Sequence, residues 1–189
     1  MHRTLSDYIV DLTQNSVEAG SSVVIVDLIE QGFYIKVYIS DNGSGMDAEA
    51  LARARDPFFT DGVKHEKRKV GLGISFLAQF IAQCDGKWDM TSEAGVGTSL
   101  YFEYYGKHPD APPLGNLASA VVCCMGLPGS FDLKFSRSLD GDSYSVMRSE
   151  VIETFGDISD AETLIALREF VRLSENELII NKGTCKCQN

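Results

Sequence analysis

Apolar and polar residues alternate with two different periods in the first hundred residues. From Thr4 to Ala19 the apolar residues recur at helical spacing, which predicts an amphipathic helix with one stripe against a sheet. Thr4 can cap this helix, and Gly20 is placed to end it. Residues 22–29 and 33–40 are rich in β-branched and aromatic side chains, and the short connection between them predicts an antiparallel hairpin.

The rest of the pattern predicts, in chain order, helix 47–55, helix 71–84, strands 87–92 and 98–105, strands 131–137 and 143–149, and helix 159–173. Ser159, with Glu162 three residues later, is a capping-box signature for the last helix. Residues 107–116 are rich in proline, which predicts a linker. We therefore expect one domain over 1–106 and a small C-terminal α+β module over 117–189.

Charge and composition narrow the classes of function. The net charge of −10 disfavours a nucleic-acid-binding surface, because phosphate binding needs a basic face. We find neither an apolar leader nor a run near the ~18 apolar residues of a membrane span, so we expect a cytoplasmic protein. The odd number of cysteines fits free thiols in a reducing compartment. Cys185 and Cys187 could bind a metal, but a frayed tail explains them better.

A carboxylate and two nearby glycines follow the second strand of the hairpin. Asp41 is followed by Gly43 and Gly45, and glycine lets a flat ring approach the chain without meeting a Cβ. Taken alone, the stretch reads better as an Asn-Gly turn in a hairpin. The residues around it decide between these two interpretations.

Asp11 and Asn15 are four residues apart in the first helix and therefore lie on one side of it. A carboxylate and an amide one turn apart could hold a water and a metal ion side by side. An ordinary solvated polar face is the alternative. Asparagine is a poor residue for a helix interior, so its position calls for a reason.

A glycine-rich helix start follows the densest basic run of the chain. Residues 64–69 are almost all charged, and a run of this kind is usually a solvated surface. Gly71 and Gly73 follow at once and open a helix, whose free backbone N–H groups and dipole favour an anion. Together they predict a phosphate site under a mobile lid over residues 58–70.

Three motifs follow one another along the chain: Asp11 with Asn15, Asp41 with Gly43 and Gly45, and Gly71 with Gly73. Together and in this order they resemble the GHKL ATPase superfamily, which joins DNA gyrase, heat-shock chaperones, histidine kinases and mismatch-repair ATPases. The resemblance covers residues 4–105, and residues 58–60 with 70–75 look most like the histidine-kinase branch. It implies a layered α/β sandwich (α+β) of the Bergerat type, with a mixed, mostly antiparallel sheet and helices on one face. ATP and Mg²⁺ are the implied cofactors.

The resemblance also implies roles for individual residues. Asp41 would accept from the adenine amino group, and Asn15 would hold Mg²⁺ against the triphosphate. Asp11 stands where several branches carry a water-activating glutamate, and its shorter reach bears on the rate of hydrolysis. The other nucleotide-binding residues implied are Gly43 and Gly45 beside the ring, Thr98 behind it, Gly71, Leu72 and Gly73 at the phosphates, and Met46 and Lys69.

Two functions follow from this resemblance. We expect no phosphorylation on a histidine within this chain, because His2 stands in no helix that could carry a phosphoacceptor histidine. We therefore expect a kinase or weak ATPase that acts on a separate partner protein, without nucleic acid or membrane. The alternative is a non-catalytic module that senses ATP and signals through residues 117–189. A homodimer is left open as the assembly.

Overall fold

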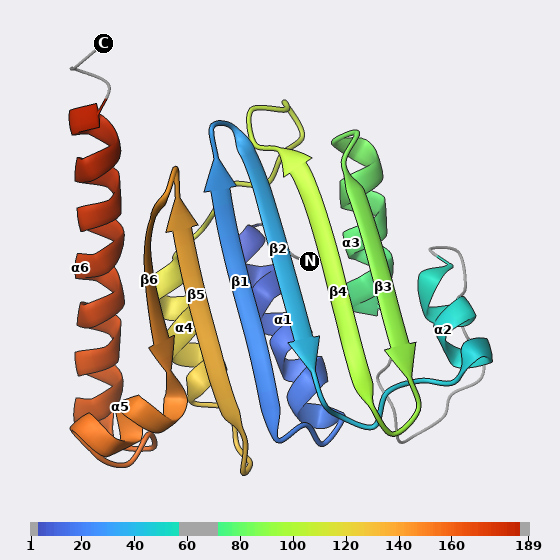
Figure 1. The fold of residues 1–189 in the computed structure, drawn as a ribbon, viewed down its shortest axis with the longest axis horizontal. Helices are drawn as coiled ribbons and strands as arrows, with labels where there is room; N and C mark the ends of the chain where they lie inside the picture. Colours follow the sequence, from blue (N-terminus) through green and yellow to red (C-terminus); the bar gives the residue numbers. More distant parts are fainter. Residues whose placement is uncertain (1–3, 57–71, 186–189) are drawn as a thin grey trace.

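A single six-stranded sheet, covered by helices on one face, forms the protein (Figure 1). The computed structural model describes residues 4–56 and 72–185. The strands lie in the order β3-β4-β2-β1-β5-β6, and every neighbouring pair is antiparallel except β1 with β5. The elements are α1 (Leu5–Glu18), β1 (Val23–Gln31), β2 (Tyr34–Asp41), α2 (Ala48–Arg55), α3 (Leu72–Gln83), β3 (Lys87–Glu93), β4 (Gly97–Tyr105), α4 (Leu117–Met125), β5 (Asp132–Leu139), β6 (Asp142–Met147), α5 (Arg148–Phe155) and α6 (Ala161–Cys185). The expected mixed α+β sandwich is confirmed.

Helix α1 begins and ends where the sequence predicts. The Thr4 side chain accepts from the backbone N–H of Asp7, and the Asp7 carboxylate accepts from the N–H of Thr4. This reciprocal capping satisfies two N–H groups that the helix itself leaves unpaired. Gly20 follows the helix with a φ of +77°, a conformation that glycine takes at little cost.

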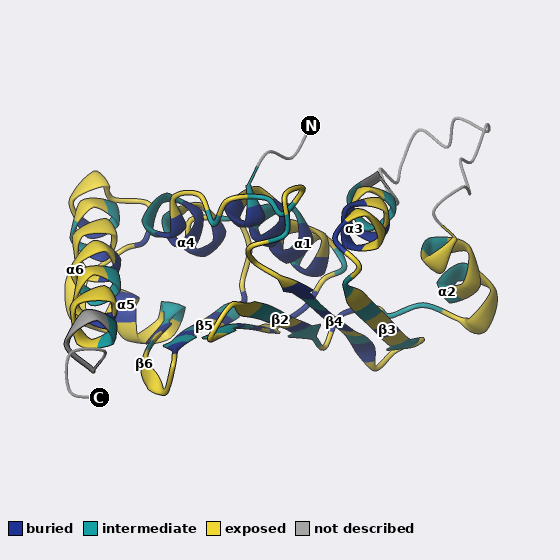
Figure 2. Ribbon diagram, turned by 90° about the horizontal axis from the view of Figure 1, so that it is seen from above, coloured by how far each residue is buried: buried dark blue, intermediate teal, exposed yellow. Residues whose placement is uncertain are grey.

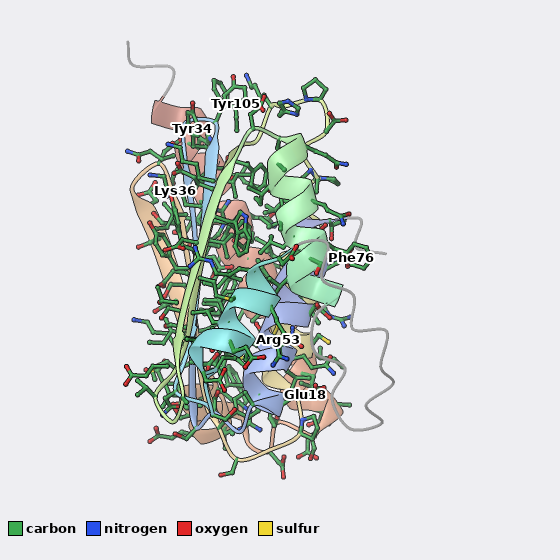
Figure 3. The ribbon with its side chains drawn as sticks, turned by 90° about the vertical axis from the view of Figure 1, so that its right-hand side faces the viewer. Glu18, Tyr34, Lys36, Arg53, Phe76 and Tyr105 are labelled. Carbon is green, nitrogen blue, oxygen red and sulfur yellow. The ribbon has the colours of Figure 1, made fainter. Side chains whose placement is uncertain are left out.

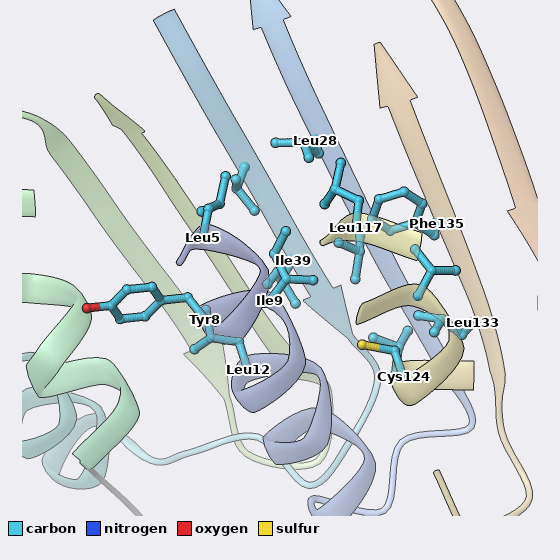
Figure 4. Close-up of a cluster of buried hydrophobic side chains, with 14 of the residues drawn as sticks. Leu5, Tyr8, Ile9, Leu12, Leu28, Ile39, Leu117, Cys124, Leu133 and Phe135 are labelled. Carbon is cyan, nitrogen blue, oxygen red and sulfur yellow. The ribbon is translucent and has the colours of Figure 1, made fainter. Parts of the chain in front are cut away.

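The hydrophobic core lies between the sheet and the helices and continues past residue 106 (Figure 4). Leu5 and Ile9 of α1 share one buried cluster with Leu117 and Cys124 of α4. Strand β5 extends the sheet by pairing in parallel with β1. Residues 107–116 therefore divide neither the sheet nor the core, and the separation into domains 1–106 and 117–189 stays a prediction about function.

The C-terminal third differs in detail from the predicted elements. Helix α4 forms from residues 117–125, which are apolar at nearly every position, so that periodicity does not distinguish a helix from a strand there. Strand β6 ends at Met147, and α5 begins at once where a continued strand is predicted. Helix α6 begins at Ala161 and runs for 25 residues, well beyond the predicted end. The Ser159 hydroxyl donates to Asp157 Oδ1, so Ser159 lies outside the helix start that it is predicted to cap.

Helices of the described ranges 4–56 and 72–185 include none that is long and apolar enough to cross a membrane.

Candidate functional site

The carboxylate of Asp41 is fixed at the end of β2 by groups from three segments. Its Oδ2 accepts from the Ser16 hydroxyl of α1 at 2.7 Å, and its Oδ1 accepts from the backbone N–H of Gly43 at 2.9 Å. The Ser21 hydroxyl lies 3.2 Å from Oδ1 and 2.6 Å from the carbonyl oxygen of Ser16. A carboxylate offers about four lone-pair sites, so Asp41 can still accept from one more donor.

The two glycines after Asp41 are required by the protein's own packing. A Cβ on Gly43 would lie 2.6 Å from Ser21 Oγ. Gly45 has a φ of +58°, and a Cβ there would lie 1.9 Å from the carbonyl oxygen of Glu93. The loop after β2 is thus pressed against the turn that follows α1 on one side and the end of β3 on the other. Whether the glycines also admit a ring stays a prediction.

Thr98 lies opposite Asp41 in the pairing of β2 with β4. Its hydroxyl is 2.9 Å from the Ser92 hydroxyl, which in turn accepts from the backbone N–H of Met46 at 2.9 Å. This chain of hydrogen bonds ties the start of β4 to the loop that carries Gly45. Three of the predicted residues, Asp41, Met46 and Thr98, are therefore neighbours.

Asp11 and Asn15 face the first turn of α3. A Cβ on Gly73 would lie 2.0 Å from Asp11 Oδ2 and 3.7 Å from Asn15 Nδ2, so both side chains approach this glycine. The start of α3 carries the positive end of the helix dipole, which favours an anion there. The structure thus places a carboxylate, an amide and a helix N-terminus together, and their roles toward a nucleotide stay a prediction.

Asp11 also borders a groove on the other side of α1. The groove has a volume of about 660 Å³ and runs between α1 and α4. It is lined by Asp7, Asp11 and Gln14 of α1 and by Asn116, Ser119 and Cys123 of the α4 region, among others. The Asp11 carboxylate therefore stands between the start of α3 and an open groove.

The described residues fit the implied ligands in chemistry. Asp41 keeps acceptor capacity for an amine, and Asn15 supplies an amide oxygen near a helix start. Mg²⁺ is commonly held by one or two protein oxygens together with phosphates and waters. Within 4–56 and 72–185, no group of three or more His, Cys, Asp or Glu side chains could hold a metal by itself. Lys69 and Gly71 lie outside the described residues, and only the backbone of Leu72 is described.

Three serines support the site without being predicted from the sequence. Ser16 and Ser21 hold the Asp41 carboxylate, and Ser92 links Thr98 to the Met46 backbone. Ser16 lies on the buried stripe of α1, and a polar residue at a core position was the available signal. Ser21 and Ser92 carry no such signal, because the Asp41 carboxylate and the Met46 N–H that they contact are 20 and 46 residues away.

Comparisons with known proteins agree with this geometry. Residues 2–106 match the family model of histidine kinase-, DNA gyrase B- and HSP90-like ATPases. A putative sensor protein of Shewanella frigidimarina is 30% identical over 99 residues, which cover 51% of this chain and 15% of that protein. The sensor histidine kinase RcsC of Escherichia coli is 28% identical over 99 residues, which cover 51% of this chain and 10% of RcsC. The chain thus spans a small part of the length of these relatives.

Among solved structures, the N-terminal domain of a DNA repair protein has a similar fold, with a TM-score of 0.52 and 14% identity. The match covers 81% of this chain and 57% of that one, so it includes residues beyond 106. The segment that matches the family model is more than half of the chain and contains all three motifs. The chain therefore belongs to the histidine kinase-, DNA gyrase B- and HSP90-like ATPase family.

Proposed function

We propose that this chain binds Mg²⁺-ATP between α1 and α3 and transfers the γ-phosphate to a separate partner protein, with slow transfer to water in its absence. The observation that carries the proposal is the meeting of Asp11, Asn15 and the first turn of α3. ATP would supply the phosphoryl group that is transferred. Mg²⁺ would neutralise negative charge on the triphosphate. This chain's residues would bind and orient them and handle the proton of the acceptor.

Asp41 supports the adenine end of this proposal. Its carboxylate is immobilised by Ser16 and Gly43, so an additional donor would meet a preorganised acceptor. Preorganisation lowers the entropic cost of binding. Asn15 lies in α1, and Asp41 is held by Ser16 of the same helix. One rigid helix would therefore position both ends of the nucleotide.

The groove between α1 and α4 supports transfer to a partner. An acceptor group that enters there would approach Asp11 from the side opposite to Gly73. Asp11 could then take the acceptor's proton, a contribution usually worth about 10²–10⁴-fold in rate.

The binding half of the proposal is tested by ATP-induced thermal stabilisation. At a ligand concentration of a hundred times Kd, linkage gives about 2.7 kcal/mol, or roughly 5–11 °C for a domain of this size. Asp41→Ala and Asn15→Ala should each remove most of this shift. Asn176→Ala, in the exposed part of α6, is the matched control and should keep it. If both site variants respond to ATP like the parent, the site assignment is wrong.

The catalytic half is tested at Asp11. Asp11→Asn preserves the side chain's size and should keep ATP binding while phosphoryl transfer to water falls by about 10²-fold or more. Asp11→Glu should also be slower, because the aspartate already contacts the α3 start and a longer side chain must be displaced. A parent without turnover, or an Asp11→Asn variant as fast as the parent, would contradict catalysis by Asp11 and favour the sensing alternative.

A further inference from the structure

Within residues 4–56 and 72–185, no helix lies on the face of the sheet away from α1, α3 and α4, and we call this the uncovered face (Figure 2). Tyr34 and Lys36 project from this face, whereas Phe76 and Arg53 lie on the helix side (Figure 3). Because side chains alternate along a strand, the pairing registers fix which residues share this face. One row across it reads Asp89, Tyr101, Tyr38, Asp27, Ser136 and Ser145.

One half of the uncovered face is a ridge of tyrosines. Tyr38 of β2 and Tyr101 of β4 have ring centroids 4.6 Å apart, and Tyr34 and Tyr105 on the same two strands are 5.4 Å apart. Tyr34 is 53% exposed and Tyr38 41% exposed. Tyrosine is enriched at protein interfaces, because it combines a large apolar ring with a hydroxyl group.

The other half of the uncovered face is a hollow lined by serines. It has a volume of about 400 Å³ on β1, β5 and β6. Four small hydroxyl side chains share this face there, together with Asp27 and Lys134; the serines are Ser136, Ser138, Ser143 and Ser145. The uncovered face therefore carries a ridge next to a hollow. The two are opposite in shape, and both present hydroxyl groups.

Charges of both signs lie beside the tyrosine ridge, although the whole chain carries −10. Glu103 lies 3.9 Å from Lys36 and 3.7 Å from Lys87, and it accepts from the Tyr101 hydroxyl at 2.5 Å. The hydrogen bond from Tyr101 and the two lysines hold the pKa of Glu103 below its usual value. Beside Tyr101, a second copy would therefore meet a carboxylate that is already paired with two lysines.

We propose that a second copy of this chain packs on the uncovered face, about a two-fold axis that runs along the strands between β1 and β2. A two-fold interface must be complementary to itself, and a face with both a ridge and a hollow meets this condition. This axis places β4 over β5 of the second copy and β2 over β1. Tyr101 then faces Ser136 of the second copy, and Tyr38 faces Asp27, so hydroxyl groups meet hydroxyl or carboxylate groups.

The area of the uncovered face fits a dimer of moderate affinity. Six strands at about 4.8 Å spacing, each about 25 Å long, give a plane of roughly 600 Å² per copy. Side-chain relief adds to this value, and a standard interface buries about 800 Å² per partner. The competing apolar surface is the outer side of α6, where Ile165, Leu173 and Ile180 are exposed.

Sedimentation velocity over a concentration series tests the dimer. The parent should pass from monomer to dimer as concentration rises. Tyr38→Glu should shift that transition to at least tenfold higher concentration and keep the thermal shift with ATP, because Tyr38 is not part of the nucleotide site. Leu173→Glu on α6 is the matched control and should leave the transition unchanged. A parent that stays monomeric, or a dimer lost with Leu173→Glu and kept with Tyr38→Glu, would overturn the proposal.

Engineered cysteines test the axis itself. In a background with Cys123, Cys185 and Cys187 replaced by serine, a chain carrying both Tyr101→Cys and Ser136→Cys should form a covalent dimer with a bismaleimide cross-linker of about 10 Å reach, because sheets packed face to face lie about 10 Å apart. Within one chain β4 and β5 are three strand spacings apart, about 14 Å, beyond the reach of this cross-linker. Each single-cysteine variant should stay unlinked. An absent link in the double variant, or equal linking in a single variant, would refute this arrangement.

Discussion

Replacing the buried Arg137 of β5 tests how firmly the C-terminal helix is joined to the sheet. Arg137 is only 2% exposed, and its guanidinium donates to Glu30 Oε2 of β1 at 2.9 Å and to the carbonyl oxygen of Ser138 at 2.7 Å. Its Nε lies 3.5 Å from Glu175 of α6. Arg137 therefore joins a carboxylate of the family-matched segment to one of the C-terminal helix.

The loss in free energy of unfolding caused by Arg137→Met depends on how far Glu30 and Glu175 stay paired without the guanidinium. Removing one partner of a buried ion pair costs about 3–5 kcal/mol. Here Glu30 keeps Lys182 at 3.1 Å, and Glu175 keeps the Tyr144 hydroxyl at 2.8 Å. We therefore expect the lower end, about 3 kcal/mol, which lowers Tm by roughly 6–12 °C in a protein of this size.

Denaturant unfolding of Arg137→Met, followed by circular dichroism, measures this change. Arg168→Met, an exposed arginine of α6, is the control and should change the free energy of unfolding by less than about 0.5 kcal/mol. A single cooperative transition at lower denaturant is the expected result. An Arg137→Met variant as stable as the parent would refute the reasoning, since packing would then replace the ion pair at no cost.

Three further predictions concern the first helix, the loop after β2 and a buried thiol. Gly45→Ala should lower the free energy of unfolding by about 1–3 kcal/mol, because it combines a positive φ with a collision at the Glu93 carbonyl; a Tm equal to the parent's would contradict this. Thr4→Ala should cost about 1 kcal/mol in the same assay by removing the α1 cap, whereas Thr4→Ser should cost little. Burial raises the pKa of the Cys124 thiol from 9 in the unfolded chain to about 12 in the folded protein. The thiol therefore contributes its full stabilisation below pH 9, and this contribution is lost as the pH rises from 9 towards 12. Cys124→Ala should therefore show a shallower fall of stability over that pH window, and equal slopes would refute the assignment.

The N-terminal half of the fold could be predicted because its signals are local. The cap at Thr4, the stop at Gly20 and the alternation of the hairpin each depend on residues within a few positions. The same holds for Asp11 and Asn15, because a helix places residues four apart on one side. The close approach of Gly45 to the Glu93 carbonyl could not be predicted in this way, because the two residues are 48 positions apart.

Two features of the C-terminal third, the helix α4 and the pairing of β5 with β1, could not be predicted, for physical reasons. The run that forms α4 is apolar at nearly every position, and periodicity cannot distinguish a buried helix from a buried strand in such a run. The parallel pairing of β1 with β5 joins segments about a hundred residues apart, and no turn signal marks it. A proline-rich connection at 107–116 therefore reads as a domain boundary, although the sheet continues on the other side.

The position of α1 decides where a response to nucleotide can occur. On its sheet side α1 is held by the core, and on one flank Leu5 and Ile9 share that core with α4. The contact of α1 with α3 at Gly73 differs, because it joins a carboxylate to the first turn of a helix. Packed apolar contacts resist small displacements more than a polar contact at a helix end does. We therefore expect binding at Asn15 to change the start of α3 and to leave the packing of α1 on α4 intact.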